Sequence, residues 1–78
     1  MKPTLHEDRG YVFRIEYSPE AETAWVVEFP DFSEIITSGN SLQDAFAQAC
    51  EALDLHLESL QKLGKRLPRA KAQLALTQ

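Results

Sequence analysis

The stretch YVFRIEY, residues 11–17, alternates strictly. Its odd-numbered residues are aromatic or aliphatic, and Val12, Arg14 and Glu16 lie between them. This period of two is typical of a half-buried strand. A polar segment containing a proline follows at residues 18–22, and a second apolar stretch covers residues 23–29. Because a five-residue polar link suits antiparallel neighbours, we expect the two strands to form a hairpin.

Proline and glycine bound the rest of the predicted sheet. Pro30 closes the second strand because proline cannot donate a backbone hydrogen bond to a ladder. Asp31 follows it in a loop, and residues 34–38, EIITS, form a short third strand rich in β-branched residues. Gly39 interrupts this strand, and we expect it to adopt a backbone angle that other residues resist.

A long amphipathic helix is predicted after the third strand. Ser41 is a candidate N-cap, and Asp44 three residues later gives an imperfect capping box. The helix should run from Leu42 to about Leu63 with one wide apolar stripe, and stop at Gly64, which suits the left-handed position after a helix.

The order of elements predicts an α+β domain in which one long helix packs on a three-stranded antiparallel sheet. We expect a flexible N-terminal segment over residues 1–10, the folded domain over 11–68 and a basic tail over 69–78. Pro68 ends the ordered pattern, and the tail leaves room for a short final strand. One edge or face of such a sheet stays open to a partner strand.

Charge is distributed unevenly along the 78 residues, whose formal net charge is −4. Residues 7–58 contain all twelve acids and only Arg9 and Arg14 as bases, a local balance of −10, whereas residues 59–78 carry five bases and no acid. An acidic body suits docking against a basic protein, although acids also serve simply to keep a small domain soluble. The basic tail is a candidate for phosphate contacts or a solvated complement to the helix end.

So small a domain buries little surface and usually needs a disulfide, a metal or a partner chain. Cys50 is the only cysteine, and the two histidines are too scattered for a structural zinc site. We therefore expect self-association, as a dimer or tetramer, or a partner protein. No apolar stretch approaches the roughly 20 residues that span a bilayer, so a cytoplasmic protein is the expectation.

The sequence offers little catalytic chemistry. His56 and Cys50 lie on the apolar stripe of the predicted helix, which favours packing roles over catalysis. Glu28 and Asp31 could act as paired carboxylates that hold a divalent metal in an enzyme, but we favour the simpler interpretation, a solvated strand residue and a turn-making aspartate after Pro30. The three glycines are isolated, so no phosphate-binding loop is present. We predict no catalytic residues, no metal site and no cofactor.

Two stretches, AWVVEFPDF at residues 24–32 and ITSGNSLQDA at residues 36–45, resemble motifs of the HicB antitoxin family. The first stretch is similar to that family's strand ending in Pro-Asp and an apolar residue. The second is similar to its Thr-x-Gly-Asp/Asn-Ser/Thr motif with an acidic helix start. Residues 63–68, LGKRLP, also look like the family's exit from the helix, so the resemblance covers about residues 11–68.

The resemblance implies a partial ribonuclease-H-like fold without nuclease activity. It also implies an antitoxin that neutralises a small basic RNA-cleaving toxin by covering the toxin's active site. Our candidate partner-binding residues are Glu28, Asp31 and Glu34, and the motif positions with structural roles are Pro30, Gly39, Ser41, Gly64 and Pro68. The alternative is a stand-alone oligomerisation or scaffold domain of the same fold, with no toxin partner.

The sequence departs from the family pattern at three places. Ala24 replaces a glycine, and residues 32–34, FSE, replace a small Pro-Gly segment. Fuller members of the family also carry a C-terminal DNA-binding module, which these 78 residues lack. We therefore do not expect direct DNA binding through such a module.

Overall fold

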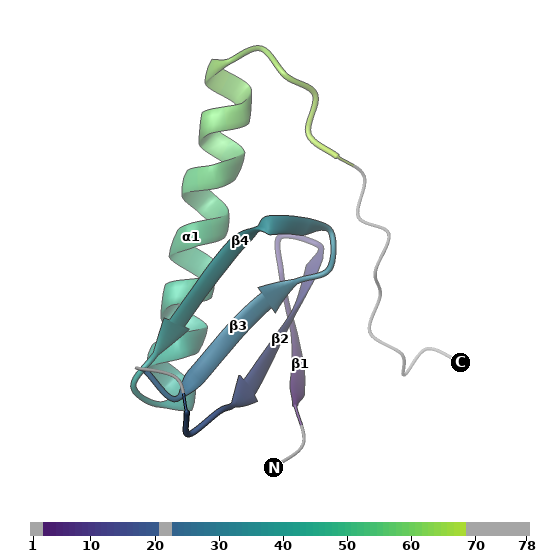
Figure 1. Cartoon of the computed structure of the whole chain (residues 1–78). Coiled ribbons are helices and arrows are strands. Elements are labelled where there is room, and N and C mark those ends of the chain that lie inside the picture. The colour runs from purple at the N-terminus through teal and green to yellow at the C-terminus, as the bar shows by residue number, and fades with distance from the viewer. Residues whose placement is uncertain (1–2, 21–22, 69–78) are drawn as a thin grey trace, which may run out of the picture.

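The computed structural model of the chain describes residues 3–20 and 23–68. Within them, four strands form one antiparallel sheet in the order β1-β2-β3-β4, and the single described helix, α1, lies along one face of it (Figure 1). The strands are β1 (Thr4–Asp8), β2 (Tyr11–Tyr17), β3 (Trp25–Phe29) and β4 (Phe32–Gly39), and α1 spans Leu42–Lys62. The predicted α+β class, with one long helix packed on an antiparallel sheet, is confirmed.

The sheet has four strands, and the prediction of three was wrong. The additional strand is β1, which lies within the segment 1–10 that was predicted to be flexible, and it pairs with β2 along its whole length. A two-residue turn joins the pair, with positive φ angles at Arg9 (54°) and Gly10 (83°). Such a turn matches the right-handed twist of a hairpin. The short final strand expected in the tail lies outside the described residues.

The core lies between α1 and the sheet. Alternate residues of β2 and β3 point toward the helix, as the period of two predicts, and small residues on α1 let it approach the strands. The buried apolar side chains of this layer are Tyr11, Phe13, Ile15, Val27, Phe29, Phe32, Ile35, Ala45, Ala49, Leu53 and Leu57.

The start of α1 is fixed by the predicted caps. The Ser41 side chain accepts a hydrogen bond from the Asp44 backbone N–H at 3.0 Å, and the Asp44 carboxylate accepts from the Asn40 N–H at 2.9 Å. Gly39 lies just before these caps. The predicted reason for a glycine there, a backbone angle that other residues resist, was wrong, because the φ of Gly39 is not positive. A side chain there would instead collide with the helix, since an added Cβ would lie 2.6 Å from the Cα of Ala45.

The end of α1 is also as predicted. Gly64 has a φ of 74°, its N–H donates to the Gln61 carbonyl, and the Lys65 N–H donates to the Leu60 carbonyl. This pair of bonds is the Schellman pattern. Beyond it the Tyr11 hydroxyl donates to the Pro68 carbonyl, so the chain after the helix returns to the start of β2.

Candidate partner-binding surface

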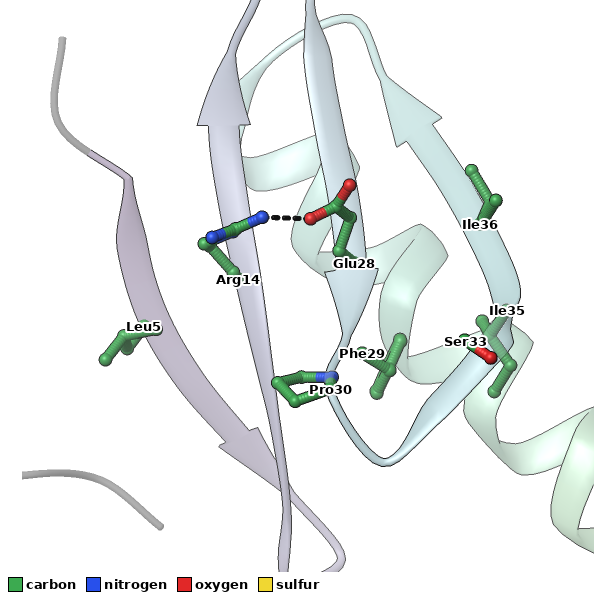
Figure 2. A pocket seen from close by; sticks show the side chains of 8 residues that line it. All are labelled: Leu5, Arg14, Glu28, Phe29, Pro30, Ser33, Ile35 and Ile36. Carbon is green, nitrogen blue, oxygen red and sulfur yellow. Dashed lines mark hydrogen bonds and ion pairs between the residues drawn. The ribbon is translucent and has the colours of Figure 1, made fainter. Parts of the chain in front are cut away.

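The open face of the sheet, opposite α1, carries a row of four side chains at one register level. Leu5 lies opposite Arg14, Arg14 opposite Glu28, and Glu28 opposite Ile36, so the row crosses all four strands. Arg14 and Glu28 point toward one another and form an ion pair between the two aliphatic residues (Figure 2). Both charged side chains remain about half exposed, at 44% and 55%.

This row borders a shallow groove of about 470 Å³. Phe29 and Ile35, whose side chains belong to the core, also line it, and Pro30 and Ser33 line it beside the β3–β4 turn (Figure 2). The groove therefore has an aliphatic and aromatic lining with one ion pair at its centre. Leu5 belongs to β1, a strand that the sequence pattern does not predict, and the groove is therefore not predictable from that pattern.

The three predicted partner-binding acids gather near the β3–β4 turn but face different sides. Glu28 lies on the open face, and Asp31 is a half-buried turn residue that interacts with its surroundings. Glu34 reaches toward the helix, where one of its carboxylate oxygens lies 2.8 Å from the Nε2 of His56. That contact lacks hydrogen-bond geometry, so it is an attraction only when the imidazole is protonated.

Other acids add to the negative surface. Among the described residues Arg9 pairs with Asp54, and Lys62 lies at 4.0 Å from Glu58. Within the same part of the chain, four further acids have neither an ion-pair partner nor a hydrogen-bond partner. These are Glu7, Glu16, Glu20 and Glu51. The strands and the outer side of α1 therefore retain the acidic excess of the sequence.

The candidate catalytic side chains are packed into the fold. His56 meets the ring of Phe32 edge-on, with ring centres 5.2 Å apart, and His6 stacks on Phe13. Burial raises the pKa of the Cys50 thiol, and the nearby Asp8 carboxylate raises it further. A thiol with a raised pKa is a weak nucleophile at neutral pH.

The described ranges contain no group of three or more histidine, cysteine or acidic residues that could hold a metal ion. Glu28, one of the two carboxylates considered for a metal, is engaged by Arg14. In the same ranges no helix is long and apolar enough to cross a membrane.

Comparison with protein families gives one match. Residues 11–78 match the model of the HicB_like antitoxin of bacterial toxin-antitoxin system, which is most of the chain. The chain belongs to this family. The resemblance carried by residues 24–32 and 36–45 is thereby confirmed. Neither the curated proteins nor the solved structures contain a match to this HicB-like chain, so its likeness to ribonuclease H stays a prediction.

Proposed function

We propose that this HicB-like chain binds a small basic RNA-cleaving toxin and neutralises it by covering the toxin's active site. The family supplies the toxin–antitoxin context. The observation that carries the proposal is the acidic surface, because Glu7, Glu16, Glu20 and Glu51 have no ion-pair partner among the described residues. Complementary charge steers a basic protein to such a surface and favours it over other partners. Inhibition here is by binding, and no residue is assigned a catalytic role.

We assign the toxin contact to the surroundings of the β3–β4 turn, with Glu28, Asp31 and Glu34 as the contact residues. The carboxylates of Glu28 and Glu34 are more than half exposed although each has an internal partner. Exposed ion pairs contribute only about 0–1 kcal/mol to stability. A lysine or arginine of the toxin can therefore replace Arg14 at little cost to the fold, and can approach Glu34 from the exposed side of its carboxylate.

Inhibition is tested by mixing the chain with the toxin of the same toxin–antitoxin pair and following RNA cleavage. We expect cleavage to stop near a one-to-one ratio, because occlusion of an active site needs one binding domain for each toxin. Cleavage that continues unchanged under a molar excess of the chain contradicts the proposal.

The contact site is tested with two matched triple variants. The substitutions Glu28→Gln, Asp31→Asn and Glu34→Gln together should weaken toxin binding at least about tenfold, because each removes one charge from the interface. The control carries Glu20→Gln, Glu51→Gln and Glu58→Gln, which remove the same charge from exposed positions elsewhere. Equal weakening by both sets, measured by calorimetry at one ionic strength, would reject the assigned site and leave only general charge steering.

A further inference from the structure

The sheet has two edges, and they differ in chemistry. In the described order β1-β2-β3-β4, the outer strands β1 and β4 each have one side of the backbone without a partner strand. The β1 edge carries the acids Glu7 and Asp8, whereas β4 carries no charge from Ile35 to Gly39. Proteins usually protect such edges with charged residues, proline or a bulge. The bulge between β3 and β4 lies at Glu28 and Phe29, so most of β4 beyond it is regular strand.

The edge of β4 is also apolar on its open face. Ile36 is 75% exposed, more than any other large apolar side chain among the described residues. It lies at the β4 end of the row that contains Arg14 and Glu28, on the border of the groove (Figure 2). A β-branched residue this exposed on an unprotected edge marks a place for strand addition.

Helix α1 adds an uncharged flank on the other side of the sheet. We call this flank, together with residues 35–39 of β4, the uncharged strip. Helix α1 lies closest to β4, with His56 against Glu34 and the start of the helix against Gly39. At 100° per residue, the flank of α1 that turns outward beyond His56 holds four residues, none of them charged. They are Gln48, Ala52, Leu55 and Ser59, and Leu55 is 60% exposed. The opposite flank is polar, since it carries Asp54 in its ion pair with Arg9.

We propose that a second copy of this chain occupies the strip, by antiparallel pairing of the two β4 strands about a two-fold axis. The pairing makes one eight-stranded sheet with the two α1 helices side by side on the same face. Neighbouring strands are about 4.8 Å apart, so two helices lying directly over their own β4 would be too close to one another. Helix α1 also packs on β3 and β2, which sets its axis inward of β4 and leaves room for the roughly 8–10 Å at which helices pack. Ile36 then approaches its counterpart on one side of the sheet, and Leu55 approaches its counterpart on the other.

The distribution of charge favours a second copy of this chain, rather than a basic protein, as the partner that binds this strip. The strip offers no carboxylate between Ile35 and Gly39 to attract a basic protein, whereas the acids lie on the rest of the surface. An isologous contact opposes each residue to the same patch on the other copy. Two β4 edges can meet without opposing like charges, but two β1 edges would bring Glu7 and Asp8 of both copies together. The proposal does not depend on the existence of a toxin.

The test is the mass of the chain in solution, measured by light scattering from about 1 to about 100 µM. We expect the unmodified chain to reach twice the 8.8 kDa of one copy. The variant Ile36→Lys should remain at the mass of one copy, because the two-fold axis brings both lysines together. The matched control is Leu5→Lys, which places the same charge at the other end of the same row, on β1. This control should dimerise like the unmodified chain.

Each alternative result has a definite meaning. A single-copy mass for the unmodified chain up to about 100 µM overturns the proposal. Loss of the dimer in both lysine variants would place the contact on the open face, and loss only in Leu5→Lys would place it on β1, so either result rejects the β4 edge. A third variant, Leu55→Lys, should raise the dissociation constant at least about tenfold, because it opposes two charges between the helices. Circular dichroism establishes that each variant is folded, as expected for substitutions at exposed positions.

Discussion

Cys50 shows how burial and a neighbouring carboxylate together lower the reactivity of a single side chain. Burial is the main cause of the raised pKa of its thiol, and the Asp8 carboxylate adds to it both by its charge and by accepting a hydrogen bond. Only the thiolate reacts with alkylating reagents, so a raised pKa lowers the reactive fraction at a given pH. The same feature removes Cys50 from the candidates for a nucleophile.

Replacement of Asp8 therefore should activate Cys50. We expect Asp8→Asn to move the midpoint of the pH–rate profile for iodoacetamide alkylation to lower pH and to raise the rate at pH values below that midpoint. The control is Glu7→Gln, which removes the same charge from the neighbouring position of β1, where the side chain points to the other face. Equal acceleration by both variants would mean that net charge, rather than the Asp8 contact, controls the thiol.

At the scale of the elements, β2 and α1 could be predicted because their apolar residues follow the period of their own geometry. Strand β1 could not, because Thr4, His6 and Asp8 face the helix side while its only large apolar residue, Leu5, faces outward. Hydrophobic alternation is therefore inverted in β1. The signal that could have revealed it is Gly10, because a glycine with positive φ is typical of a two-residue hairpin turn.

The candidate site was predictable to a similar extent. The order of motifs in residues 24–45 was sufficient to indicate the family, which the match over residues 11–78 confirms. The pairing of Glu28 with Arg14 was not predictable, because it depends on the register between β2 and β3. The same holds for Glu34, whose neighbour His56 is 22 residues away along the chain.

Gly39 governs how closely β4 and α1 approach. An added Cβ would lie 2.6 Å from the Cα of Ala45 and 2.8 Å from the carbonyl carbon of Asp44, and backbone atoms cannot move aside as a flexible side chain can. We expect Gly39→Ala to lower the free energy of unfolding by about 1–3 kcal/mol, the usual cost of overpacking. Urea denaturation followed by circular dichroism measures it.

The control for this prediction is Gly64→Ala, where φ is 74° and the space around an added Cβ is open. There the cost comes only from the left-handed backbone, about 1 kcal/mol. If Gly39→Ala proves as well tolerated as Gly64→Ala, the start of the helix can move away from β4, and the close approach is not required for the fold.

At the scale of the whole molecule, the two proposed associations should respond to salt in opposite directions. Each copy has a formal net charge of −4, so two copies repel one another at long range while the β4 contact itself is uncharged. A basic toxin, in contrast, is attracted by the same acids. The screening length falls from about 30 Å at 0.01 M to about 8 Å at 0.15 M salt, which weakens both effects.

We therefore expect added salt over this range to lower the dissociation constant of the dimer at least about twofold and to raise that of the toxin complex. Light scattering at both salt concentrations measures the first, and calorimetry measures the second. The variant Ile36→Lys serves as the control, since it should stay at the mass of one copy at either concentration. A dimer that dissociates on addition of salt would require ion pairs across the interface, and the uncharged edge of β4 provides none.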